Sequence, residues 1–228
     1  MTSASARRSP DDAFTWEDAL TTLFPAASRL LAFALPLLLV ACAHPVSVQP
    51  DIRALTEAAG PRLPIALALH VAPEDSEREV TTAGGGGDSI RYFLYRDLEG
   101  AMVLALSRVF EKVVVVRRML AGDELARDGF QLAVQPRFIS ASGSNSAFTW
   151  PPTFFSLSVT AAFIDAGGRT VSLIQESGSG KAEFAEFRTA TGLAGQRAAA
   201  DLLNRLAERL RKDPSLASVA SSAPPIRP

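Results

Sequence analysis

Chemically reactive side chains are scarce in this chain of 228 residues. The single cysteine, Cys42, excludes an internal disulfide and any site built on several cysteines, and two histidines, His44 and His70, are too few for a histidine metal cage. The 23 basic and 24 acidic residues nearly cancel and form no block of one sign, which argues against nucleic-acid binding. Neither GxxxxGK(S/T) nor G-x-S-x-G occurs. We therefore expect no enzyme activity, no metal and no cofactor.

The hydrophobic residues are instead concentrated in one run directly before the cysteine. Residues Leu30–Ala41 read LLAFALPLLLVA, carry no charge and follow Arg29. A helix that crosses a bilayer needs about 20 apolar residues, so this run is too short to span one comfortably. It has the length of the apolar core of a secretory signal peptide. We interpret residues 1–41 as a signal peptide; the alternative is a buried cysteine in an apolar helix.

The segment before this run is unusual for a signal peptide. Residues 1–28 are long and contain four acidic residues, whereas the start of a signal peptide is normally positive. We hypothesise that translation starts later, at a non-AUG codon near Leu20 or Leu23. Mass spectrometry of the unprocessed precursor tests this, because a peptide from residues 1–15 would contradict it.

The tetrapeptide Leu39-Val40-Ala41-Cys42 resembles the bacterial lipobox. The resemblance implies cleavage between Ala41 and Cys42, with a diacylglyceryl group and an N-linked acyl chain such as palmitate on Cys42. Two or three acyl chains give stable membrane anchoring. Ala43 rather than Asp follows the cysteine, which by the same resemblance implies a periplasm-facing protein of the outer membrane. Cleavage would leave 20 basic and 20 acidic residues, because three Arg and four acidic residues lie in residues 1–41.

The remaining chain is predicted to form one α+β domain over residues 65–212. Alternating or continuous apolar residues predict strands, and a stripe at helical spacing predicts a helix. The expected elements are strands at 65–71, 113–116, 130–140, 154–164 and from 170 toward 183, with helices at 94–110 and 195–211. The order is strand, helix, strand, then two or three strands that end in a hairpin, then a helix (β-α-β-β-β-α where two are counted). This order predicts a single-layer mixed sheet of four or five strands with two amphipathic helices on one face. The four valines of 113–116 are typical of a strand covered on both faces.

Three segments are expected to lie outside this core. Residues 42–64 are polar and contain proline, as expected of a tether. Residues 72–89 hold an acidic run and four consecutive glycines, which we interpret as a flexible loop and not as a phosphate cradle, since Asp88 follows the glycines. Residues 213–228 are rich in serine and proline and are predicted to be a disordered tail.

The loop 147–155, AFTWPPTFF, is the candidate interaction site. Phe148, Trp150 and Phe154 surround the rigid pair Pro151-Pro152, and aromatic side chains beside prolines suit a partner or membrane interface because they bury a large area at little entropic cost. In the alternative, the aromatic residues fold back as a lid on the sheet. Replacing Trp150 and Phe148 by Ser distinguishes the interface from the lid. Unchanged partner pull-down and membrane fractionation with lowered thermal stability would favour the lid.

The lipobox and the order of elements resemble several families of small bacterial envelope lipoproteins. These are the lipopolysaccharide-assembly lipoprotein, the auxiliary lipoproteins of ABC-type lipid transport, and the YajG-like lipoproteins. The resemblance implies a lipid-anchored accessory protein of the cell envelope, in outer-membrane assembly or transport, that binds a partner protein or lipid. The strand-helix-strand opening also resembles the curli-secretion lipoprotein and the TolB amino-terminal domain, which implies a secretion-channel subunit instead. Size-exclusion chromatography of detergent-extracted protein distinguishes the two: a monomer supports the accessory protein, and a large ring supports the channel subunit.

Overall fold

The computed structural model describes residues 43–55, 60–146, 149–187 and 190–222. The chain divides at residue 41 into two units, and everything described below belongs to the second, 42–228. Its main feature is a five-stranded mixed sheet in the order β5-β2-β6-β7-β8. The strands are β2 (Leu63–His70), β5 (Phe110–Val116), β6 (Leu132–Gly143), β7 (Phe154–Asp165) and β8 (Thr170–Lys181). The first three run parallel to one another, and β6, β7 and β8 form an antiparallel meander.

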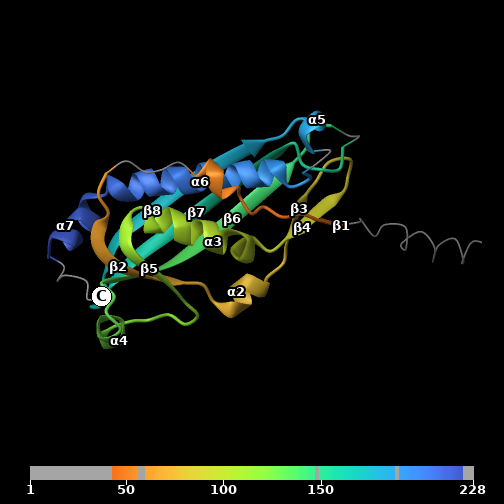
Figure 1. The fold of residues 1–228 in the computed structure, drawn as a ribbon. Helices are drawn as coiled ribbons and strands as arrows, with labels where there is room; N and C mark the ends of the chain where they lie inside the picture. Colours follow the sequence, from red (N-terminus) through yellow and green to blue (C-terminus); the bar gives the residue numbers. More distant parts are fainter. Residues whose placement is uncertain (1–42, 56–59, 147–148, 188–189, 223–228) are drawn as a thin grey trace, which may run out of the picture. The chain divides into compact units, whose positions relative to one another are not determined.

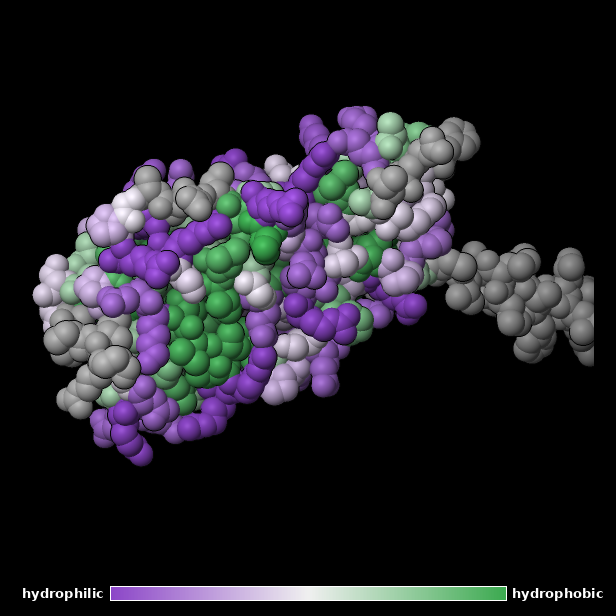
Figure 2. All heavy atoms as spheres, in the orientation of Figure 1, coloured by the Kyte–Doolittle hydropathy of each residue, from purple (hydrophilic) through white to green (hydrophobic). Residues whose placement is uncertain are grey.

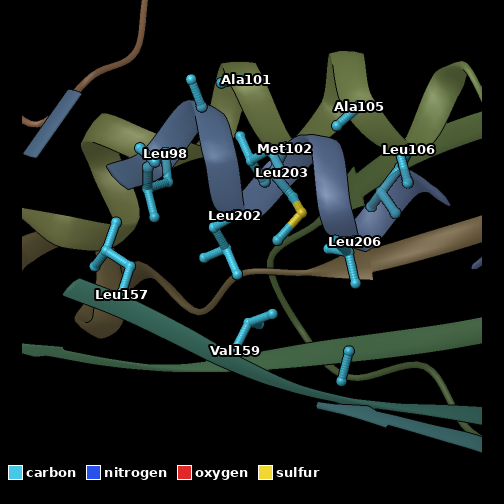
Figure 3. Packing of buried hydrophobic residues seen from close by; sticks show 14 of the residues in the cluster. Leu98, Ala101, Met102, Ala105, Leu106, Leu157, Val159, Leu202, Leu203 and Leu206 are labelled. Carbon is cyan, nitrogen blue, oxygen red and sulfur yellow. The ribbon is translucent and has the colours of Figure 1, made fainter. Parts of the chain in front are cut away.

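Helices α3 (Leu94–Ser107) and α6 (Leu193–Arg211) pack on one face of this sheet (Figure 1). Both carry apolar residues at helical spacing, and their leucines meet the apolar face of β7 in one core (Figure 3). The buried residues of β7 are those that the alternation predicts: Phe155, Leu157, Val159, Ala161 and Phe163. The α+β class and the two helices on one face are therefore confirmed. The sheet is the five-stranded form, because the four strands β5, β6, β7 and β8 lie between α3 and α6 in the chain.

The opposite face of β2 has its own small cover. Ala66 and Ala68 pack there against Leu125 of α4 (Asp123–Arg127) and against Phe130, both of which are buried. His70 also lies on this face and is 8% exposed.

The two edges of the five-stranded sheet differ. Helix α6 lies against β8, and two of its side chains form hydrogen bonds with main-chain groups of that strand. Asp201 accepts from the Ser179 N–H at 3.0 Å, and Arg197 donates to the Lys181 carbonyl at 2.7 Å. At the other edge lies β5, whose Val114 is 36% exposed. The prediction of full cover for the valines was wrong, because an apolar run in a parallel strand does not say which strand is outermost.

The exposed side of β5 continues onto α3. Val113 and Val115 of β5 and Val103 of α3 are partly buried hydrophobic residues that pack against the core. Figure 2 shows a continuous hydrophobic area on the face drawn toward the viewer, over the region in which Figure 1 draws α3 and β5.

A second, three-stranded sheet replaces the predicted flexible loop. Its order is β1-β4-β3, formed by β1 (Ala43–Pro45), β4 (Ser89–Tyr92) and β3 (Val80–Ala83), and the short helix α2 (Pro73–Glu77) precedes it. The glycine run is the turn of the β3–β4 hairpin, with Gly86 and Gly87 at φ values of 66° and 87° that only glycine adopts readily. The fold is thus not a single sheet layer.

Residues 43–55 are packed against the domain and do not hang free as a tether. Val48 and Leu55 are buried, at 0% and 3% exposure, and a short 3₁₀ helix, η1 (Ile52–Ala54), lies between them. Asp97 of α3 fixes this segment by accepting from the Val48 N–H at 2.8 Å and from the Ser47 hydroxyl at 3.1 Å. Two isolated apolar residues in a polar stretch give no periodicity, so the sequence pattern did not reveal the packing.

The expected disordered tail contains a helix. Two further helices follow β8 besides α6: α5 (Phe184–Phe187), and α7 (Pro214–Ser222), whose Leu216 is buried. Asp213 caps α7 by accepting from the N–H groups of Ser215 and Leu216 at 2.8 and 3.1 Å. The pair Asp213-Pro214, which follows the end of α6, is therefore also the start of α7, because proline is tolerated in a first turn. Within the described part of the chain, no helix is both long and apolar enough to cross a bilayer.

Candidate functional site

The predicted interaction loop lies at the end of the five-stranded sheet where β6 stops and β7 begins. At this end Gly143, Phe154 and Lys181 are paired across β6, β7 and β8. The small sheet lies at the same end, because the Thr82 hydroxyl of β3 and the Ser142 hydroxyl of β6 are 2.6 Å apart. Figure 1 shows β1, β3, β4 and α5 grouped there. The end therefore combines the predicted loop with the first described residues of the chain.

Trp150 packs on the first strand of the chain. Its ring stacks on His44 with 4.1 Å between ring centroids and 28° between the planes. His44 also forms an ion pair with Asp88, its Nε2 lying 3.4 Å from Oδ2. Both members of that pair are about one-third exposed, so it contributes little to stability. The arrangement fixes the orientation of Trp150 against β1.

Two glycines of the hairpin turn make this close packing possible. The Gly85 N–H donates to the Trp150 carbonyl at 2.8 Å. A Cβ atom on Gly84 would lie 2.5 Å from the Trp150 carbonyl oxygen, and one on Gly85 would lie 1.7 Å from that of Thr149. The glycine run therefore allows the turn of the β3–β4 hairpin to approach the loop at Trp150 closely. Asp88, which follows the run, lies against His44. This gives a structural reason for a run that does not fit a phosphate-binding motif.

The residues of the predicted interface differ in exposure. Pro151 and Pro152 are buried, Trp150 is partly exposed, and Phe154 is 41% exposed with its ring over Gly143. Ala41, Cys42 and Phe148 lie outside the described residues. Burial of the prolines suits a rigid support, and the exposed area of the loop belongs to Phe154 and to part of Trp150. The prediction of an interface itself stays a prediction.

A second exposed aromatic residue lies close by in the chain. Phe184 of α5 is 64% exposed and contacts Phe187 edge to face, with 5.7 Å between ring centroids. The Ala182 N–H donates to the Thr153 carbonyl at 3.0 Å, which holds the start of this segment against the loop before β7. Nothing in the sequence singles out Phe184, because one aromatic residue after a strand does not indicate an exposed site. The contact of His44 with Trp150 was not predictable either, since more than 100 residues separate the two in the chain.

A hydroxyl network joins the two sheets beneath the site. The Tyr92 hydroxyl lies 2.7 Å from that of Ser140 and 3.3 Å from that of Thr82, and the Ser142 hydroxyl donates to the Ala83 carbonyl at 2.5 Å. Burial raises the pKa of Tyr92, and the hydrogen bonds from Ser140 and Thr82 partly oppose that rise. The serines of this region therefore hold the small sheet in place.

Beside the hairpin is an open hollow of about 790 Å³. Its lining combines the turn of the β3–β4 hairpin with hydroxyl and amide side chains from the two strands of that hairpin and from the segment after β6: Thr81, Thr82, Ser89, Ser144, Asn145 and Ser146. Among the described residues, no three His, Cys, Asp or Glu side chains gather as a metal site would require. What the geometry offers here is a rigid end with polar and aromatic surface.

The sequence matches no protein-family model and no curated protein. Among solved structures, the fold is similar to that of a Xanthomonas campestris protein assigned to the DUF330 family, with 14% identity, a TM-score of 0.41, and coverage of 79% of this chain and 96% of that one. It is also similar to a candidate lipoprotein from Caulobacter crescentus, with 16% identity, a TM-score of 0.32, and coverage of 69% and 93%. A third similar structure is the PelC dodecamer from Paraburkholderia phytofirmans, with 13% identity, a TM-score of 0.34, and coverage of 65% and 95%.

Proposed function

We propose that this chain is a lipid-anchored accessory protein of the bacterial cell envelope. Cys42 is acylated after cleavage of residues 1–41, and the folded domain faces the periplasm from the outer membrane. The observation that carries the proposal is the position of the lipobox, whose cysteine immediately precedes Ala43, the first residue of β1. A lipidated Cys42 would therefore be joined directly to β1, a strand that pairs with β4.

The domain acts by binding, in envelope assembly or transport, and not by catalysis. The polar side chains at the loop end contact one another: His44 pairs with Asp88, and Tyr92 contacts Ser140 and Thr82. Such contacts rigidify a surface and do not activate a nucleophile. A partner protein or a lipid is the expected ligand, and no cofactor is involved.

Metabolic labelling tests the anchor directly. Because the chain has one cysteine, a radiolabelled palmitate that stays on the protein after alkaline hydroxylamine reports on Cys42 through its amide-linked chain. The parent protein and the matched control Ala43→Ser, which keeps the cysteine, are expected to take up label and to sediment with outer membranes. Cys42→Ser is expected to do neither. An unlabelled parent protein, or label retained in Cys42→Ser, would contradict the proposal.

A further inference from the structure

The distance between the anchor and the folded domain is set by the pairing of β1. Ala43, His44 and Pro45 are registered with Ser89, Ile90 and Arg91 of β4, and the Val46 N–H donates to the Arg91 carbonyl at 3.0 Å. Cys42 is thus one residue from a paired strand, and one extended residue spans at most about 3.6 Å. With acyl chains on Cys42, this end of the domain has no spacer that would lift it from the bilayer.

The side chains at this end suit the boundary between lipid and water. Trp150 stacks on His44, which follows Cys42 by two residues in the chain, and Trp150 remains partly exposed. Phe154 and Phe184 are 41% and 64% exposed. Tryptophan and other aromatic side chains favour the headgroup region, where an apolar ring and a polar edge are both accommodated. Of the nearby charges, Arg197 pairs with Glu186 and Asp88 lies against His44. The exposed Lys181 and Glu183 are opposite in sign, so this end has no excess positive charge that would call for anionic lipid.

We propose that the exposed part of Trp150, together with Phe154 and Phe184 at the same end of the sheet, lies in the headgroup layer of the bilayer that holds the acylated Cys42. This inference rests on the proposed function and adds the surface by which the domain meets the membrane. The anchor supplies the affinity, and the aromatic contacts fix the tilt and rotation of the domain. Because Pro151 and Pro152 are buried and part of the Trp150 ring packs against the core, the ring is already held in place and loses little entropy on contact with lipid.

The tryptophan content makes the test direct. The chain has two tryptophans, and Trp16 lies in the segment that cleavage removes, which leaves Trp150 as the sole tryptophan of the processed protein. The purified acylated protein is reconstituted into phosphatidylcholine vesicles, with or without lipid that carries bromine near the headgroup end of its chains. The emission of Trp150 is expected to shift to the blue on insertion and to be quenched by the brominated lipid.

A second tryptophan position provides the matched control. In Trp150→Phe combined with Leu173→Trp, the reporter moves to an exposed site on β8, since Leu173 is 61% exposed. That site is eight residues along the strand from Lys181, roughly 26 Å away, and its emission is expected to be quenched several-fold less. Equal quenching at both positions, or none at Trp150 in protein whose acyl groups are confirmed by mass, would overturn this inference alone. An unmodified Cys42 would overturn the proposed function and this inference with it.

Discussion

Two glycines of β8 allow α6 to approach the sheet more closely than a side chain would permit. A Cβ atom on Gly178 would lie 2.3 Å from the Leu202 nitrogen and 2.5 Å from the Ala198 oxygen. One on Gly180 would lie 2.0 Å from the Ala194 oxygen. These neighbours are main-chain atoms of a helix, which cannot rotate away as a side chain does. We therefore expect Gly178→Ala and Gly180→Ala each to destabilise the protein.

The size of the effect follows from the displacement. An ordinary contact between heavy atoms is about 3.5 Å, so α6 would have to move by roughly 1 Å over a core that it shares with α3 and β7. Overpacking of this kind costs about 1–3 kcal/mol, and we expect the upper end because the obstructing atoms are backbone. For a domain of this size, about 3 kcal/mol lowers the melting temperature by roughly 6–12 °C.

Gly100 is the matched control, because a Cβ atom there would meet nothing within 4 Å. It is exposed in the middle of α3, so Gly100→Ala should stabilise the protein by about 1 kcal/mol through helix propensity. Thermal unfolding followed by circular dichroism measures all three variants against the parent. If Gly178→Ala melts at or above the parent temperature, as Gly100→Ala is expected to, the close-approach argument is refuted.

Two further outcomes are expected. Arg197 hydrogen-bonds Glu186 and lowers the pKa of that carboxyl from its ordinary 4.5 to about 2, so the stabilising effect is complete above pH 4.5 and is lost as the pH falls through 2. In urea unfolding, Glu186→Gln should be less stable than the parent at pH 7 and indistinguishable near pH 2; a gap that stays constant over that range would contradict this. Leu203 is fully buried where α6 meets α3 (Figure 3), so Leu203→Ala should lower the free energy of unfolding by about 2–5 kcal/mol. A loss below about 1 kcal/mol in urea unfolding would contradict this, because it would mean that the core closes around the cavity left by the substitution.

The regular elements of the core were predictable because their apolar residues recur with a period. Phe155 to Phe163 alternate along β7, and Leu202, Leu206 and Leu210 recur along α6, and each set is buried as the pattern indicates. Val48, Leu55 and Leu216 are buried as well, but the few apolar residues around each of them do not recur over enough positions to define a strand or helix face. Their burial depends on surfaces supplied by distant elements, which no local pattern encodes.

The candidate site was predictable only in part for a related reason. The cluster of aromatic residues and prolines around Trp150 stands out in the sequence, and the lipobox is a local motif. The contact of Trp150 with His44 depends on β1 pairing with β4 and on the glycine turn approaching Thr149. Pairing of three-residue strands over long separations leaves almost no trace in composition, so the small sheet had to come from the structure.

The unequal edges of the five-stranded sheet limit how copies of this chain can associate through main-chain pairing. Growth of a sheet into a filament needs two free edges on every copy, so that each addition leaves a new edge for the next. Asp201 and Arg197 of α6 occupy main-chain groups at the β8 edge, while β5 is the outermost strand on the other side. The Ser179–Lys181 end of β8 is therefore closed to main-chain pairing with another copy, so a second copy would add to this sheet more readily along β5.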